Sequence, residues 1–225
     1  MAKSKIIKEL ANNSISLDVA LSRLFIIASD IGNDELQQWT ECELHGYGEH
    51  KLPEYRYAKN TVFKYSGING NYKVTNAPLP LLEIMKTEDP TLFYLPIPDG
   101  ISTIEGFANN PMYSEVGRDI TWAADMVYKM SGIQCYSIKQ LVPLNTFEDV
   151  LNNVKMLLMK IFIKLDKTYG CLDDLDIDTV SVSPEEVAAT NTTINNYIYV
   201  DNSVSMGDKN KIEGSEIFGG GKRNG

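Results

Sequence analysis

The sequence predicts an α+β fold: a mainly helical N-terminal domain with a small β-hairpin region, followed by a β-forming C-terminal tail. Three observations predict it. Apolar residues recur at helical spacing in residues 15–33 and again in residues 146–170. An Asn-Gly pair lies within residues 61–74, "TVFKYSGINGNYKV", between two segments rich in β-forming residues. A short repeat lies near the end of the chain, in residues 200–219.

Three helices are expected in the first part of the chain. "SKIIKELAN" predicts a short one, and "ISLDVALSRLFIIASDIGN" predicts a second that Ser16 caps and Gly32 ends. A third helix starts at Asn33 or Asp34 and runs to about His45. The apolar stripe of the second helix consists of Leu17, Leu21, Leu24, Ala28 and Ile31.

The second half contains one long packing helix, "TFEDVLNNVKMLLMKIFIKLDKTYG". Thr146 is the expected cap and Gly170 the expected end. Before it, "APLPLLEIMK" predicts a short helix, and "DITWAADMVYKMSG" a short helix or strand. The buried stripe of the long helix consists of Val150, Val154, Leu157, Leu158, Ile161 and Leu165.

The composition changes after this helix. Residues 171–193 contain six acidic residues and no basic one, which is typical of an exposed linker. Beyond it, "VDNSVSMG" aligns with "IEGSEIFG" at an offset of twelve residues, as two rungs of a β-solenoid-like repeat would. The sequence therefore divides into a helical domain (3–170), an acidic linker (171–193) and a two-rung β-repeat tail (194–219).

Two rungs are too few to bury a core, so we expect tails from several chains to wind together into a homo-oligomer. The segment "NYIYV" offers the aromatic and β-branched strand for pairing. A disordered polar tail is the alternative that composition leaves open. The expected oligomerisation residues are Tyr197, Tyr199, Val200, Met206, Ile212, Ile217 and Phe218.

Charge and cysteine content limit the partners. The 225 residues carry a formal net charge of −9 with scattered basic residues, and this charge argues against a nucleic-acid partner. The sequence contains no apolar run near the roughly 18 residues of a membrane span and no signal-peptide core. We therefore expect no membrane association. Three widely spaced cysteines fit reduced thiols, so we expect a bacterial-type cytoplasm.

Residues 34–56 contain both histidines and one cysteine, which raises the question of an active site. Cys42 and His45 are three residues apart on the expected helix, but the sequence provides no group to orient the imidazole. Adding His50 gives at most three metal ligands without a zinc-site spacing. We therefore expect no catalytic residue, no metal site and no cofactor here.

A structural role explains this segment better. Trp39 and Cys42 follow Leu36 at helical spacing, so we expect them to pack inward. Glu43 lies near the negative end of the helix dipole and needs a cationic partner. Arg56 returns to it after the rigid turn at Pro53, which predicts a Glu43–Arg56 ion pair, bidentate if the geometry allows.

Three tyrosines lie close to Arg56 in the sequence. Tyr47, Tyr55 and Tyr57, together with Arg56, form the expected binding surface of the segment "GYGEHKLPEYRY". Such a surface suits a protein partner. A stacking surface for a nucleotide base is the alternative.

The segments "ISLDVALSRLFIIASDIGNDELQQW", "ECELHGY" and "LPEYR" resemble the N-terminal part of the AbiTii family, found in bacterial abortive-infection systems against phage. The long helix resembles the later helical segment of that family, so the resemblance covers roughly residues 3–170. It implies a role in antiviral defence, and it brings no catalytic residues.

The function that we expect is a non-enzymatic component of antiphage abortive infection, which self-assembles through its tail and binds a phage trigger or partner effector. A catalytic toxin, such as a nuclease or a nucleotide-processing enzyme, is the first alternative. A nucleotide sensor is the second.

Overall fold

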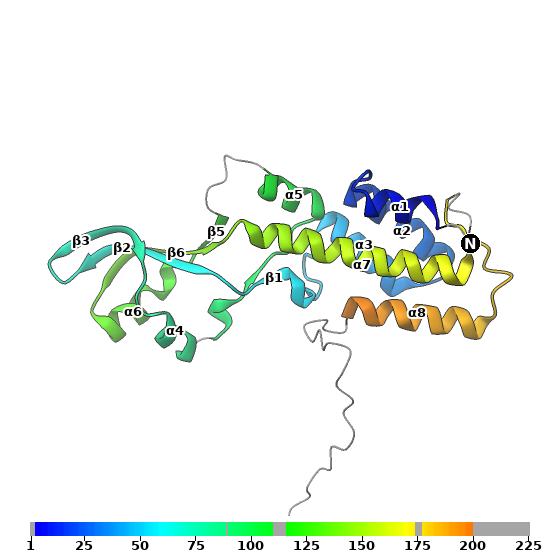
Figure 1. The fold of residues 1–225 in the computed structure, drawn as a ribbon. Helices are drawn as coiled ribbons and strands as arrows, with labels where there is room; N and C mark the ends of the chain where they lie inside the picture. The colour runs from blue at the N-terminus through cyan, green and yellow to red at the C-terminus, as the bar shows by residue number, and fades with distance from the viewer. Residues whose placement is uncertain (1–2, 89, 110–115, 174–176, 200–225) are drawn as a thin grey trace, which may run out of the picture.

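A computed structural model describes residues 3–88, 90–109, 116–173 and 177–199. The molecule is elongated, with a helical part at one end and a sheet-based part at the other (Figure 1). Helix α7 (Asn145–Tyr169) runs along the helical part and starts where the sheet ends. The α+β class expected from the sequence is therefore confirmed for the described residues.

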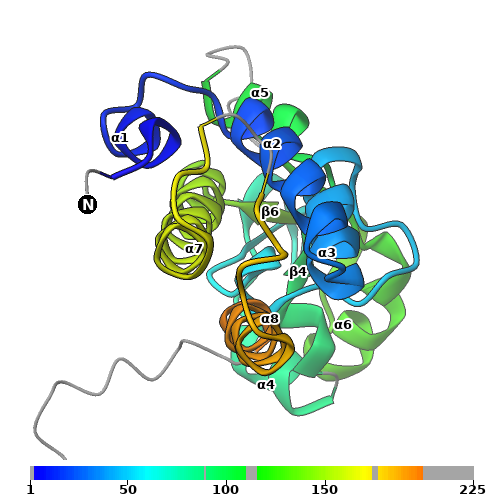
Figure 2. The ribbon, with the colours of Figure 1, turned by 90° about the vertical axis from the view of Figure 1, so that its right-hand side faces the viewer.

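The helical part is built around α7. Its other helices are α1 (Lys5–Ala11), α2 (Leu17–Asp30), α3 (Asp34–His45), α5 (Ile101–Asn109) and α8 (Pro184–Tyr199). Seen along its axis, α7 lies between α1 and α8, with α2 and α3 to one side (Figure 2). The buried side chains of α7 include the whole expected stripe: Val150, Val154, Leu157, Leu158, Ile161 and Leu165. Each fully buried Leu or Ile contributes about 1.5–3 kcal/mol, so this stripe is a main source of stability.

The first helix boundaries follow from local chemistry. The Ser16 hydroxyl accepts a hydrogen bond from the Val19 amide at 3.3 Å, which caps α2 as expected. The Asn33 side chain accepts one from the Leu36 amide at 3.1 Å and caps α3. Gly32, between the two helices, adopts a left-handed backbone with φ of +62°.

The expected cap of α7 was wrong. The helix begins at Asn145, its N-cap residue is Leu144, and no side chain caps it. The Thr146 amide instead donates to the Pro143 carbonyl at 2.9 Å. A tight turn at Pro143 therefore starts the helix, and Thr146 already lies inside the first turn.

The sheet has four antiparallel strands in the order β3-β2-β6-β5. Their bounds are β2 (Val62–Asn69), β3 (Tyr72–Pro78), β5 (Val116–Asp119) and β6 (Gln134–Val142). The predicted hairpin is confirmed as β2–β3, with Asn69 opposite Tyr72. A second, two-stranded sheet pairs β1 (Tyr57–Ala58) with β4 (Leu95–Pro96).

One face of the larger sheet is covered by α4 (Leu82–Glu88) and α6 (Ala124–Ser131), both of which lie below the strands in Figure 1. Phe63 and Ile138 from the strands pack with Met85 and Val127 from these helices in a separate small core. Among the described residues, three short 3-10 turns connect these elements: η1 (Glu54–Arg56), η2 (Pro90–Phe93) and η3 (Thr121–Ala123).

The expected acidic linker is corrected by α8. Its second half, from Pro184, is helical and continues to Tyr199. Thr190, Ile194 and Ile198, four residues apart, are buried against the main core. This spacing places one narrow stripe on the core, while the acidic residues face outward.

The segment "NYIYV" was expected to form a strand, but Tyr197 and Tyr199 lie in α8. The remaining expected oligomerisation residues, Val200, Met206, Ile212, Ile217 and Phe218, lie outside the described residues.

Candidate functional site

Helix α3 carries a charged residue into the interior. Leu36, Trp39 and Glu43 share one face of the helix, and the Glu43 side chain is fully buried. Trp39 and Cys42 are buried as well, as expected from their spacing. A buried carboxylate needs partners, because removing it from water is costly.

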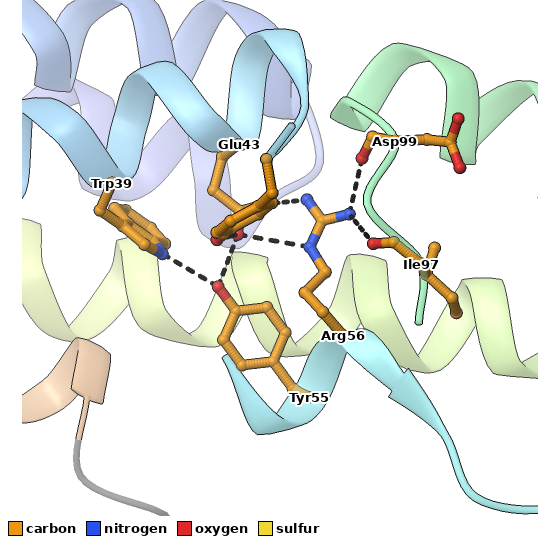
Figure 3. A network of polar contacts seen from close by, with 7 residues as sticks. Trp39, Glu43, Tyr55, Arg56, Ile97 and Asp99 are labelled. Carbon is orange, nitrogen blue, oxygen red and sulfur yellow. Dashed lines mark hydrogen bonds and ion pairs between the residues drawn. The ribbon is translucent and has the colours of Figure 1, made fainter. Parts of the chain in front are cut away.

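The partners come from the chain that follows the helix (Figure 3). Glu43 Oε1 accepts hydrogen bonds from the Tyr47 hydroxyl at 2.5 Å and the Tyr55 hydroxyl at 2.6 Å. Arg56 forms an ion pair with Glu43 Oε2 through one Nη, and its Nε lies 3.4 Å from Oε1. The indole N–H of Trp39 donates to the Tyr55 hydroxyl at 2.9 Å. The two residues that the sequence analysis paired are thus in bidentate contact.

Arg56 also binds a third segment. Its other Nη donates to the Asp99 carbonyl at 2.8 Å and, more weakly, to the Ile97 carbonyl at 3.5 Å. The Arg56 carbonyl accepts from the Ile97 amide at 2.8 Å. The guanidinium carbon lies 5.3 Å from the ring centroid of Tyr47. Arg56 therefore joins α3, the turn η1 and the segment before α5.

Backbone packing at this junction leaves no room for a side chain. Gly46 ends α3 with φ of +97°, and a Cβ there would lie 2.9 Å from the Pro98 carbonyl oxygen. A Cβ on Gly100 would lie 2.4 Å from the Leu44 carbonyl oxygen. Glycine is required at both positions because the two segments touch through their backbones.

The electrostatics of this cluster fix its protonation. Burial, and then the Glu43 carboxylate, raise the pKa of Tyr47 and of Tyr55 well above the ordinary value. Burial lowers the pKa of Arg56, but the attraction of Glu43 outweighs it and the net shift is upward. Both tyrosines remain neutral donors and Arg56 remains a cation. The cluster holds three chain segments together.

This burial corrects the expected binding surface. The Tyr47 side chain is 3% exposed and Arg56 is fully buried, so neither can meet a partner. Their polar groups are used inside the protein, where Glu43 needs them. Tyr55 and Tyr57, by contrast, line a cleft.

Cys42 lies inside the protein, whereas His45 and His50 are exposed. Cys42 is buried, and burial followed by the charges of Glu41 and Glu43 raises the pKa of its thiol. A raised pKa disfavours the thiolate that a nucleophile requires. His50 Nδ1 lies 3.0 Å from the Gln38 side-chain nitrogen. Within the described ranges, no group of three His, Cys, Asp or Glu side chains is placed to hold a metal ion.

A cleft of about 700 Å³ lies beside this cluster, where the segment around η1 meets α7 and the end of α8. Tyr55 and Tyr57 line one side, Lys160 of α7 a second, and Tyr197 and Tyr199 of α8 a third. Two residues that were expected to pair tails therefore line a cleft on the body of the protein.

A second hollow, of about 630 Å³, adjoins the cleft and shares Glu54, Tyr57 and Lys59 with it. We call it the aromatic hollow, and its remaining lining residues are Leu92, Tyr94, Pro96, Arg118 and Trp122. The Trp122 side chain is 67% exposed and Tyr94 is 49% exposed. An exposed large aromatic ring is ordinary when it stands alone, but several that converge on one hollow are typical of a binding site.

Hydrogen bonds from the interior orient Arg118, one of the basic residues of the aromatic hollow. Arg118 Nε donates to the Gln140 side-chain oxygen at 2.8 Å. Gln140 is fully buried, and its amide nitrogen donates to the Thr61 hydroxyl at 3.0 Å and to the Leu92 carbonyl. The sheet and η2 therefore fix the position of the Arg118 guanidinium.

A comparison with protein families decides the affiliation. The AbiTii family model matches residues 4–193. The chain belongs to the AbiTii family. Abortive infection is the defence role that this family suggests, which confirms the resemblance seen in the sequence. No curated protein and no solved structure matches the chain.

The match extends the AbiTii region beyond its expected end near residue 170 and into α8. Ile194 and Ile198, just beyond the match, pack on the same core as α2 and α7. No helix in the described part of this AbiTii protein is long and apolar enough to cross a membrane.

Sequence reasoning missed the aromatic hollow of this AbiTii protein. Tyr94, Arg118 and Trp122 lie far from the segment of residues 34–56 and come together only because of strand pairing and η3. Trp122 was the available signal, because this large aromatic residue lies shortly after the charged residues Arg118 and Asp119 and outside any predicted apolar stripe.

Proposed function

We propose that this AbiTii protein is a non-enzymatic component of antiphage abortive infection, which binds a phage trigger or a partner effector in the cleft and the aromatic hollow. The observation that carries the proposal is the joint lining of the two: Glu54, Tyr57 and Lys59 belong to both. A ligand can therefore bridge them. Exposed aromatic and cationic groups in one concave place supply both contact area and orientation.

The buried groups support a binding role over a catalytic one. The Glu43 carboxylate and the Arg56 guanidinium are both fully buried and bound to each other. Cys42 is buried with a raised thiol pKa. Glu43, Arg56 and Cys42 are thus enclosed by the fold, whereas His45 and His50 are exposed.

Self-assembly is the second half of the proposal. The repeat in residues 200–219 is the sequence feature that supports it. Ile194 and Ile198 fix α8 to the core, so any tail contact begins at a defined place on the body. Joining several binding sites in one assembly raises avidity without a new contact.

Phage challenge of cells that carry single substitutions tests the binding role. Trp122→Ala and Tyr94→Ala remove ring surface from the aromatic hollow, and protection is expected to fall while the protein stays folded. Tyr72→Ala is the matched control, because Tyr72 is 76% exposed at the tip of the hairpin, away from the hollow.

The same assay tests the catalytic alternative. Cys42→Ala and His45→Ala are expected to retain protection as long as circular dichroism shows them folded. Loss of protection in the folded Cys42 and His45 variants, with the hollow variants unaffected, would contradict the non-enzymatic role.

Light scattering tests assembly. The full-length chain is compared with a chain cut after Tyr199, which keeps α8, and the mass is expected to fall to that of one chain on truncation. A cut after Thr193 is unsuitable because it removes Ile194 and Ile198 from the core. An unchanged number of chains per particle after truncation would contradict the assembly proposal.

A further inference from the structure

The ligand class of the aromatic hollow follows from its chemistry. We infer that the hollow binds a mononucleotide, with the base stacked on the exposed rings and the phosphate at Arg118. This inference rests on the proposed function, because it assumes that the hollow is the binding site.

The rings come from three separate elements. Tyr57 belongs to β1, Tyr94 to the link between η2 and β4, and Trp122 to η3. No hydrogen bond to another described residue holds the Trp122 indole N–H or the Tyr94 hydroxyl, which leaves both available to a ligand. Flat rings of this kind stack on nucleobases, and each stacked base contributes substantially to affinity.

Arg118 supplies the charge. Its Nε is committed to Gln140, and among the described residues its guanidinium makes no ion pair with a carboxylate. Glu54, the acidic residue that lines the hollow, forms an ion pair with Lys59. Asp119, next along the strand, accepts a hydrogen bond from the Thr121 amide at 2.8 Å. The two Nη groups of Arg118 can therefore bind a phosphate in a fork.

Size and overall charge favour a small ligand. About 630 Å³ lies within the ordinary range for small-molecule sites. A formal net charge of −9 repels a long polyanion, because the field of the whole chain acts on every phosphate. One or two phosphates placed directly at a fixed guanidinium gain more than they lose.

A proline-rich or acidic peptide is the rival occupant, since aromatic grooves also bind such peptides. The lining favours the nucleotide. In the hollow, Arg118 is oriented by Gln140 and lies beside the rings of Tyr94 and Trp122. This arrangement matches a base joined to a phosphate.

Isothermal titration calorimetry on the full-length protein tests the inference with AMP and GMP, their nucleosides, and inorganic phosphate. Saturable binding of at least one mononucleotide is expected, with a dissociation constant below about 1 mM. Tryptophan emission is recorded in parallel. Trp122 is expected to report the ligand, because Trp39, the other tryptophan, is only 2% exposed.

Two variants separate the base from the phosphate. Trp122→Ala is expected to weaken the mononucleotide and its nucleoside alike, by roughly 5- to 150-fold. Arg118→Gln is expected to weaken the mononucleotide by roughly 10- to 150-fold and to leave the nucleoside unchanged. Two controls change residues outside the hollow: Tyr72→Ala removes an exposed ring, and Arg23→Gln removes an arginine of α2. Both variants should bind the mononucleotide as the wild type does.

Three results would overturn the inference. The first is no saturable binding of any mononucleotide by the folded protein. The second is mononucleotide binding that Trp122→Ala and Arg118→Gln leave unchanged. The third is Trp122-dependent binding of a proline-rich or acidic peptide in place of the mononucleotide. In the first and third cases the proposed function survives if Trp122→Ala still abolishes phage protection, so the two failures are distinguishable.

Discussion

Replacing Arg56 by methionine tests whether the buried cluster holds the fold together. The substitution keeps most of the apolar stem and removes the guanidinium. Glu43 would lose its ion pair in a fully buried site and retain the hydroxyl groups of Tyr47 and Tyr55. The carbonyl groups of Ile97 and Asp99 would lose their donor as well.

The expected magnitude follows from burial. Removing one partner of a buried ion pair typically costs about 3–5 kcal/mol, because the other charge is left uncompensated. With a urea dependence of roughly 2–3 kcal/mol per molar for a chain of this size, the unfolding midpoint should fall by about 1–2.5 M. Circular dichroism reports the helices, and the fluorescence of Trp39, which is bonded to Tyr55 in the same cluster, reports the site.

Arg23→Met is the matched control. Arg23 pairs with Glu9 at 3.2 Å, and both side chains are partly exposed. A surface pair of this kind contributes at most about 1 kcal/mol. In the double variant Glu43→Leu with Arg56→Met, neither charge remains, so its loss of stability should be smaller than the sum of the two single losses. If Arg56→Met unfolds within about 1 kcal/mol of the wild type, the cluster does not hold these segments and the reasoning fails.

Three further predictions concern the other contacts of the fold. Burial raises the pKa of Asp166, but hydrogen bonds from Ser4 outweigh it and the net shift is downward. Its stabilising contribution is therefore complete above about pH 4 and lost as the pH falls through the depressed value. Asp166→Asn should lower the urea midpoint clearly at pH 6 and much less at pH 3, and an equal loss at both would contradict this. Gly100→Ala places a Cβ 2.4 Å from the Leu44 carbonyl oxygen. It should cost about 1–3 kcal/mol in urea unfolding, because the two backbones must separate, and a neutral result would show that this segment is loosely packed. Ile194→Ala removes a fully buried side chain of α8 and should cost about 2–5 kcal/mol by the same assay. A cost under 1 kcal/mol would mean that α8 does not belong to the core.

Local chemistry in the sequence was enough to place much of the helical part. Ser16 and Asn33 cap their helices through their own side chains, and these bonds involve residues only three positions away. The stripe of α7 repeats over many turns, so its period is unmistakable. Glu43 and Arg56 are in contact across 13 positions because a short, proline-bearing turn returns the chain to the helix that it left.

The sequence misled where a signal was short or local. Thr146 has the chemistry of a cap, but a turn at Pro143 starts α7 before it. The acidic composition of residues 171–193 hid a helix, because α8 buries only one residue in four along a single line. Tyr47 and Arg56 were placed on a surface because composition does not say which polar groups the interior needs.

The sequence by itself therefore determined the secondary structure that is fixed by neighbours along the chain, and the membership in the AbiTii family. Only the tertiary structure decided the cleft and the aromatic hollow. Tyr57, Tyr94, Arg118 and Trp122 belong to four segments, and strand pairing and helix packing bring them to one place. Hydrogen bonds and burial across such separations depend on the whole folded chain, so no local pattern of residues could predict them.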